Sequence, residues 1–280
     1  MPLRMPDYAQ AELDAQYINT GTPEADVALQ TLRDRSAANR ARLVVEEGHR
    51  YGAHPLETFD LFPSGARGPG PALVFVHGGQ WRLNTTRETS FWADVAVACG
   101  FAFVGLNYPK VPEVRIARQA TSVVDAWKTL VGSADGYDID PRRMVLAGHS
   151  SGAHVVALAL STGLDDVAPG PAAVLLYSGV YDMQPVRRSS RNAALDLDPA
   201  EAEALSVVRR PPRRPPPVLT LVGAQESAEY RRQARLLHES LPPEAGHRLA
   251  VLEESDHFTT PTDLYDPDGL GWNFINTFCI

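Results

Sequence analysis

Short apolar segments alternate with longer amphipathic segments along most of the chain. Short apolar runs bounded by turn residues are typical of β-strands, and longer runs with helical spacing of apolar residues are typical of helices. The predicted strands are Glu57–Phe62, Ala72–Val76, Phe101–Leu106, Met144–Ala147, Ala172–Tyr177, Pro217–Val222 and Arg248–Leu252. The predicted helices are Thr89–Cys99, Val114–Leu130, Ser151–Leu160, Ser227–Leu241 and Leu270–Phe278. This alternation predicts an α/β fold with a mostly parallel central sheet covered by helices on both faces.

Two segments lie outside this alternation. The amino-terminal stretch, residues 1–42, is polar and predicts helix, with Tyr17, Leu29 and Leu32 as its packing contacts. Residues 189–208 are rich in Ala, Asp and Glu and lie between two predicted strands. They predict either a small helical cap insertion or a surface helix without function. Because no repeat and no linker divides the chain, we expect residues 1–280 to form a single domain.

The composition narrows the partners that this protein can have. The 280 residues carry a net charge of −8, which argues against nucleic acids and anionic membranes. No apolar run approaches the roughly 20 residues needed to cross a bilayer, and the amino terminus lacks the apolar core of a signal peptide. Cys99 and Cys279 stand far apart and predict neither a disulfide framework nor a cysteine-based metal site. We expect a cytoplasmic protein with a small-molecule partner; its oligomeric state, a homodimer included, is left open.

The pentapeptide Gly148-His149-Ser150-Ser151-Gly152 stands between a predicted strand and a predicted helix. A G-x-S-x-G pattern in that position is typical of a sharp turn that exposes a serine hydroxyl. Glycines at both ends let the turn close without a Cβ clash. Isolated matches to this pattern arise by chance, so it is the flanking strand and helix that favour a catalytic interpretation. We predict that Ser150 is a nucleophile.

A second motif, His77-Gly78-Gly79-Gln80-Trp81, directly follows a buried strand. Glycines let the backbone approach a reacting carbonyl group, and fixed N–H groups there stabilise the negative charge that develops on its oxygen. We predict an oxyanion hole formed by the N–H groups of Gly79, Gln80 and Ser151. The alternative is a simple Gly-Gly turn. His77 is interpreted as shaping the loop, not as a base.

A serine nucleophile needs a histidine base, and His238, His247 and His257 follow Ser150 along the chain. His238 falls within a predicted helix, and His247 opens a predicted strand. His257 lies in the loop after the last predicted strand, at the carboxyl end of the sheet, where open α/β sheets place their chemistry. We predict that His257 is the base.

The predicted acid is Glu226, because it closely follows the end of the predicted strand Pro217–Val222. A carboxylate there would hold the imidazole in its useful tautomer and stabilise it once protonated. Glu229, on the next predicted helix, and Asp256, adjacent to His257, are the alternatives. Neighbouring side chains on an extended loop point apart, which disfavours Asp256.

Four stretches and one strand end together resemble a known family. They are Tyr51-Gly52 with Glu57–Leu61, His77–Arg82, Asn107-Tyr108-Pro109, Gly148–His154 and Glu226–Gln233. These stretches are similar to the Y-G … D-L-Y, H-G-G-Y-W, N-Y, G-H-S-A-G-A-H and D-x-P-E-F-x-R-Q motifs of the kynurenine formamidases (arylformamidases) and related small esterases of the α/β-hydrolase fold. The last motif also aligns the family's acid with Glu226. The sequence departs at Gln80, where the family has tyrosine, and at Ser151, where it has alanine.

The resemblance implies an α/β-hydrolase fold and a serine hydrolase that uses no cofactor and no metal. The implied reaction cleaves a small ester or amide, with an N-formyl or short-acyl aryl substrate, through an acyl-enzyme. The implied substrate pocket includes Gly78, Trp81 and Tyr108, with a flat aryl group packed against Trp81. A carboxylesterase of small aryl or alkyl esters is the alternative reaction, and a non-catalytic ligand-binding homologue is the alternative of another class.

Overall fold

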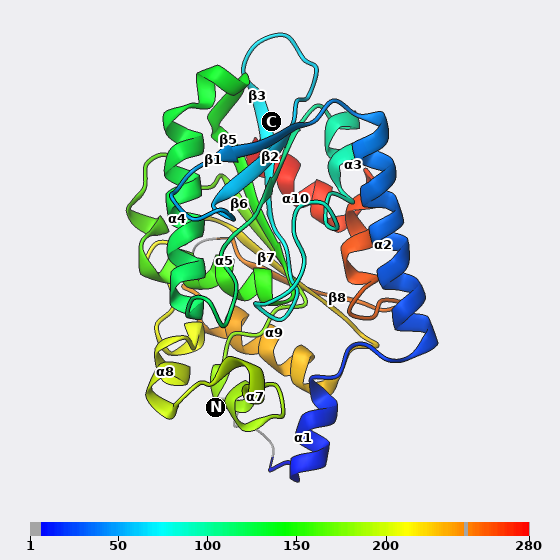
Figure 1. The fold of residues 1–280 in the computed structure, drawn as a ribbon, viewed down its shortest axis with the longest axis vertical. Coiled ribbons are helices and arrows are strands. Elements are labelled where there is room, and N and C mark those ends of the chain that lie inside the picture. Colours follow the sequence, from blue (N-terminus) through cyan, green and yellow to red (C-terminus); the bar gives the residue numbers. More distant parts are fainter. Residues whose placement is uncertain (1–6, 244–245, 280) are drawn as a thin grey trace.

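The computed structural model of the chain describes residues 7–243 and 246–279. Its centre is one eight-stranded sheet with the order β1-β2-β4-β3-β5-β6-β7-β8 (Figure 1). The strands are β1 Glu46–Arg50, β2 Thr58–Phe62, β3 Gly70–Val76, β4 Ala102–Leu106, β5 Ile139–His149, β6 Ala173–Tyr177, β7 Val218–Gly223 and β8 Arg248–Leu252. β1 and β2 pair antiparallel with their neighbours, and all other strands pair parallel. The predicted α/β class and the mostly parallel sheet are confirmed.

Helices cover both faces of the sheet. They are α1 Gln10–Gln16, α2 Pro23–Arg42, α3 Ala93–Ala98, α4 Ile116–Gly132, α5 Ser151–Thr162, α6 Met183–Arg188, α7 Asn192–Leu195, α8 Pro199–Ala204, α9 Ala228–Ser240 and α10 Leu270–Cys279. Figure 1 shows α4 and α5 on one side of the sheet and α2, α3 and α10 on the other. Side chains of β3 alternate accordingly: Val74 belongs to the core under α4 and α5, and Phe75 to the core under α3 and α10. A continuous apolar run is what a strand buried on both faces requires.

Two local predictions differ from the structure. β1 was not predicted, because Glu46–Arg50 is a polar, mostly exposed edge strand that lacks an apolar face. The predicted helix Thr89–Cys99 begins only at Ala93. Before it, the hydroxyls of Thr89 and Ser90 donate to backbone carbonyls one turn earlier in the chain, and such local bonds compete with regular helix formation.

Helix α1 contacts the segment 183–209, which lies in the connection from β6 to β7 and carries α6, α7 and α8. Gln10 donates a hydrogen bond to the Arg188 carbonyl, and the Ser190 N–H donates to Asp14. Figure 1 shows α1 and α7 side by side at one end of the molecule. Among the helices of the described ranges, none has the length and apolar character to cross a membrane.

Candidate active site

Ser150 occupies the turn between β5 and α5. Its backbone dihedrals, φ 56° and ψ −126°, are rarely adopted by a residue with a side chain and indicate local strain. The flanking glycines permit this turn: a Cβ on Gly148 would lie 2.7 Å from the Cα of Ala153, and one on Gly152 would lie 2.1 Å from the Val76 oxygen. The strand, the turn and the helix thus lie where the G-x-S-x-G pattern predicted them.

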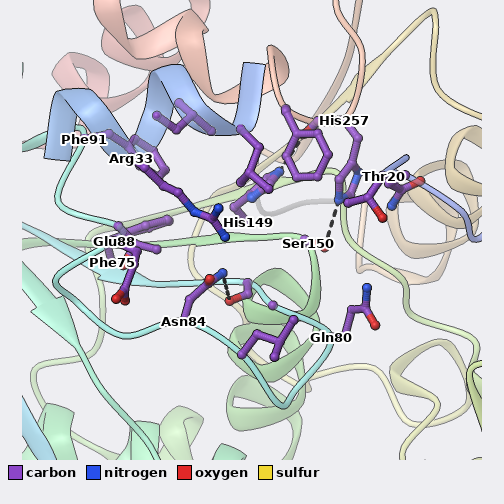
Figure 2. Close-up of a pocket in the computed structure, with 18 of the residues that line it drawn as sticks. Thr20, Arg33, Phe75, Gln80, Asn84, Glu88, Phe91, His149, Ser150 and His257 are labelled. Atoms are coloured by element: carbon purple, nitrogen blue, oxygen red, sulfur yellow. Dashed lines mark hydrogen bonds between the residues drawn. The ribbon is translucent and has the colours of Figure 1, made fainter. Parts of the chain in front are cut away.

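A chain of hydrogen bonds joins Ser150, His257 and Glu226. His257 Nε2 lies 2.9 Å from Ser150 Oγ (Figure 2), and His257 Nδ1 lies 2.8 Å from Glu226 Oε2. The second carboxylate oxygen of Glu226 accepts from Ser178 Oγ at 2.6 Å and from the Gly223 N–H at 2.8 Å. Because Glu226 is buried, these donors stabilise its negative charge. This geometry would allow Ser150 to act as a nucleophile, His257 as its base and Glu226 as the carboxylate that orients the imidazole.

The alternative acids and the alternative base form other contacts. Glu229 is fully buried and forms an ion pair with Arg232, with 2.6 Å between Oε1 and Nη2. Asp256 accepts from the Phe258 N–H within its own loop. His247 precedes the first residue of β8, whereas His257 follows the carboxyl end of that strand.

His149, next to Ser150, anchors the loop that carries His257. Its Nε2 lies 2.8 Å from the His257 carbonyl oxygen, so the ring N–H donates a hydrogen bond to that oxygen. Burial, together with the neighbouring His257, lowers the pKa of His149 to about 3, and the ring therefore stays neutral. The sequence did not predict this role, because only the histidines that follow Ser150 along the chain are candidates for the base.

The glycine loop presents two N–H groups beside Ser150, and the start of α5 presents a third. Gly79, Gln80 and Trp81 have φ values of 126°, 56° and 62°, so the backbone turns back on itself. The N–H groups of Gly79, Gln80 and Ser151 have no acceptor within the ranges that the structure describes. Gly78 allows the close approach of this loop, since a Cβ there would lie 2.9 Å from the Ser150 Cβ. Successive N–H groups in such a turn form a concave site for negative charge.

Buried polar side chains form hydrogen bonds with the backbone of this loop. His77 bonds through Nδ1 to the Gly78 carbonyl at 2.8 Å, and its Nε2 lies 3.0 Å from Lys110 Nζ. The Tyr108 hydroxyl donates to the His77 carbonyl at 2.6 Å, and its ring stacks on the imidazole. Burial lowers the pKa of Lys110 to about 7. His77 therefore shapes the loop, and Tyr108 lies beneath it.

Trp81 and Ser151 connect the loop to α5. The Trp81 N–H donates to Ser151 Oγ at 3.1 Å, and its indole N–H donates to His154 Nδ1 at 3.1 Å. His154 Nε2 in turn donates to the Leu205 carbonyl at 2.9 Å. Trp81 is 3% exposed, so both of its polar groups are used within the fold. The serine that replaces the family's alanine supplies the acceptor for the loop.

Two hollows of unequal size adjoin Ser150. The larger, about 100 Å³, is also lined by Gly78, Gly79, Gln80, His149 and His257 (Figure 2). Its apolar walls are Leu29, Leu32, Phe75, Leu83, Phe91 and Phe258. The smaller, about 10 Å³, is lined by Tyr17, Gln80, Trp81, Ser150, Ser151, Val180, Val186, Arg191 and Tyr230.

Side chains from the amino-terminal segment and from segment 183–209 complete both hollows. Leu29 and Leu32 of α2 line the larger one, Tyr17 lines the smaller one, and Arg191 lines both. The Arg191 guanidinium donates to the Tyr17 carbonyl, which holds the two segments together beside Ser150. In the described part of the chain, no group of three or more His, Cys, Asp or Glu side chains could hold a metal ion.

Known proteins of similar sequence or structure include a formamidase, an esterase and a candidate thioesterase. Residues 73–227 match a protein family described as alpha/beta hydrolase fold. The chain is 27% identical over 259 residues to the kynurenine formamidase of Danio rerio, spanning 84% of this chain and 83% of that protein. It is 31% identical over 122 residues to esterase LipQ of Mycobacterium tuberculosis, spanning 40% of this chain and 29% of that protein. A solved structure of a candidate thioesterase from Silicibacter sp. is similar with a TM-score of 0.80 and 29% identity, over 95% of this chain and 99% of that one.

Proposed function

The chain belongs to the α/β-hydrolase fold family, and from this premise we propose that it is a serine hydrolase acting through an acyl-enzyme. The observation that carries the proposal is the continuous hydrogen-bonded chain from Ser150 through His257 to the buried Glu226. The free N–H groups of Gly79, Gln80 and Ser151 beside the hydroxyl support it.

In the proposed first step, Ser150 Oγ attacks the carbonyl carbon of the substrate as its proton moves to His257 Nε2. Glu226 accepts from Nδ1 and stabilises the imidazolium that forms. The carbonyl oxygen becomes an oxyanion, which accepts hydrogen bonds from the loop and from the start of α5. As this intermediate collapses, His257 gives the proton to the leaving alcohol or amine, and the acyl group stays on Ser150.

In the proposed second step, water attacks the acyl carbon and gives a proton to His257. The same oxyanion hole stabilises the second intermediate. His257 then returns the proton to Ser150 Oγ as the acyl–oxygen bond breaks, and a carboxylic acid leaves. Each turnover therefore consumes one water and leaves every side chain in its starting protonation state.

We propose that the substrate has a small acyl group and a larger leaving group, because the two hollows beside Ser150 differ in size. A leaving group takes its proton from His257, so it must lie in the larger hollow, which His257 lines. The acyl group then occupies the smaller hollow, beside Gln80 and Ser151. The small size of this hollow favours a formyl or acetyl group over a long acyl chain. We propose residues 189–208 as the cap, since Arg191 lines both hollows.

The substrate class that we propose is an N-formyl or short-acyl aryl compound. We place its aryl ring in the larger hollow, near Phe258, because the rings of Trp81 and Tyr108 are buried and their polar groups are bonded within the fold. Gly78 also lines this hollow. The similarity to a kynurenine formamidase over most of both chains favours the formamide, N-formylkynurenine included. The shorter similarity to an esterase favours the alternative, a carboxylesterase of small esters.

Two measurements test this proposal. A fluorophosphonate probe should label the wild-type protein and leave Ser150→Ala unlabelled, and an unlabelled wild type would reject the serine mechanism. The ratio of kcat/KM for N-formylkynurenine to that for p-nitrophenyl acetate then separates the two reactions. If the formamide is inert while the ester is cleaved, the esterase alternative holds.

A further inference from the structure

The charged side chains that line the larger hollow have a net positive charge, whereas the protein as a whole is negatively charged. The protein as a whole has a net charge of −8. The hollow is lined by two arginines, Arg33 and Arg191, and by one carboxylate, Glu88. Charges that line a concave site act on whatever enters it, because low-dielectric walls concentrate their field.

Arg33 differs from the other two charged groups because its guanidinium has no hydrogen-bond acceptor in the described part of the chain, although its charge helps to lower the pKa of Glu88. Two other arginines of α2 have carboxylate partners: Arg35 lies 2.8 Å from Asp94, and Arg40 lies 2.8 Å from Asp60. Arg33 has neither an ion pair nor a hydrogen bond within residues 7–243 and 246–279. Figure 2 shows its side chain reaching from the helix into the space between the residues that line the hollow.

The other two charged groups are already engaged. The Arg191 guanidinium donates to the Tyr17 carbonyl. Glu88 Oε2 accepts from the Thr85 N–H at 2.7 Å and from the Thr85 hydroxyl at 2.6 Å. Burial raises the pKa of Glu88, but these hydrogen bonds, together with the nearby Arg33 charge, outweigh it, and the net shift is downward. Arg33 interacts with Glu88 through its charge alone, so its N–H groups remain available to donate hydrogen bonds to an anion.

We propose that Arg33 binds a carboxylate on the leaving-group half of the substrate, an inference that rests on the serine hydrolase proposed above. The planar guanidinium can donate two parallel hydrogen bonds to a carboxylate. His257 lines the same hollow, so an anion bound there belongs to the leaving alcohol or amine and not to the acyl group. The preferred substrates are thus short-acyl esters or amides whose alcohol or amine carries a carboxylate.

The test compares two probes of nearly equal shape, 4-acetoxybenzoate and its neutral analogue 4-acetoxybenzamide. The wild-type protein should cleave 4-acetoxybenzoate with a higher kcat/KM than 4-acetoxybenzamide. Arg33→Gln should lower the ratio of these two kcat/KM values by about 10- to 100-fold, mainly by raising KM for the acid. Arg42→Gln is the matched control, because Arg42 is an exposed arginine of the same helix that does not line the hollow. Glu88→Gln should raise the ratio by about 2- to 5-fold, because it removes a nearby negative charge.

Inhibition provides a readout that does not depend on cleavage of either probe. 4-Hydroxybenzoate should inhibit hydrolysis of p-nitrophenyl acetate more strongly than 4-hydroxybenzamide, and Arg33→Gln should remove the difference. Equal ratios in wild type and Arg33→Gln, or equal inhibition by acid and amide, would overturn the role of Arg33. That result is distinct from failure of the proposed function, in which p-nitrophenyl acetate is not cleaved and Ser150 is not labelled.

Discussion

At the scale of single residues, the proposed chemistry depends on one proton moving between Ser150 and His257 across 2.9 Å. Ser150→Ala and His257→Ala should each abolish turnover with nearly equal losses, because members of a triad act as a unit. Circular dichroism should remain that of the wild type. Ser161→Ala, on the same helix but bonded only to the Ala157 carbonyl, is the control that retains activity. Wild-type rates in Ser150→Ala would exclude this residue as the nucleophile.

The assignment of Glu226 as the acid needs its own test, because Glu229 and Asp256 are alternative carboxylates for this role. Glu226→Gln should lower kcat by about 10²- to 10⁴-fold with little change in KM, since an amide no longer holds the imidazole in the useful tautomer. Asp256→Asn is the control: Asp256 bonds to the backbone of its own loop and should matter little for kcat. A neutral Glu226→Gln with a crippled Asp256→Asn would reverse the assignment.

The sequence could predict these residues because each lies in a local motif at the end of a strand. Gly148 to Gly152 marks a strand–turn–helix, and His257 and Glu226 follow apolar strands whose carboxyl ends meet at one edge of a parallel sheet. The supporting groups are different. Ser178 bonds to Glu226 and His149 to the His257 carbonyl only after distant strands have paired, and no local pattern reports such contacts.

At the scale of elements, the junction of β3, β5 and α5 leaves no room for a side chain at Gly152. A Cβ there would lie 2.1 Å from the backbone oxygen of Val76, which has no freedom to move away. Gly152→Ala should therefore lower the free energy of unfolding by about 3 kcal/mol or more. Gly163→Ala, at the other end of α5, places its Cβ 3.8 Å from a Val124 methyl and should change stability by less than about 1 kcal/mol. Urea unfolding measures both, and equal effects would contradict the close approach of β3 to α5.

A buried lysine that contacts the glycine loop through His77 has a charge that depends on pH. Burial lowers the pKa of Lys110 from 10.5 to about 7. Between these values the unfolded chain binds more protons than the folded protein, so stability rises with pH. The free energy of unfolding of the wild type should rise between pH 7 and 9 by about 0.5 to 1.4 kcal/mol per unit more than that of Lys110→Met. Parallel curves for the two proteins would show that Lys110 is charged in the folded state.

The elements themselves were predictable where their apolar pattern was strong. β3 and β7 are continuous apolar runs because both of their faces are buried, and α4 carries apolar residues at helical spacing. β1 is an edge strand of polar residues, so nothing in its pattern separates it from a loop. Its place is set by pairing with β2, a contact that only the folded chain contains.

At the scale of the whole molecule, segments that are far apart in the sequence meet beside the candidate active site. Asn19 donates to the Tyr230 hydroxyl at 2.8 Å, and the Tyr230 ring lies 4.8 Å from the ring of His257. Arg191 reaches the Tyr17 carbonyl from segment 183–209. Helices were predicted in both segments, and a cap was one of two alternatives for residues 189–208. Nothing in the sequence predicted that the amino-terminal segment lines the site, because contacts between polar surface segments leave no periodic signal. The substrate preference therefore depends on the parts of the chain that sequence reasoning described least.

We expect the smaller hollow to limit the length of the acyl chain that the protein can cleave. If the acyl group occupies the hollow of about 10 Å³ between Trp81, Val180 and Val186, each added methylene must displace packed side chains. For p-nitrophenyl esters, kcat/KM should fall by about 10- to 100-fold from acetate to butyrate, and further for octanoate. Lengthening the alcohol instead, from ethyl acetate to n-butyl acetate, should change kcat/KM by less than about 5-fold, because the larger hollow beside His257 accepts the leaving group. Efficient cleavage of the octanoate would mean that the acyl chain lies in the larger hollow, which would exchange the two assignments and place Arg33 on the acyl side.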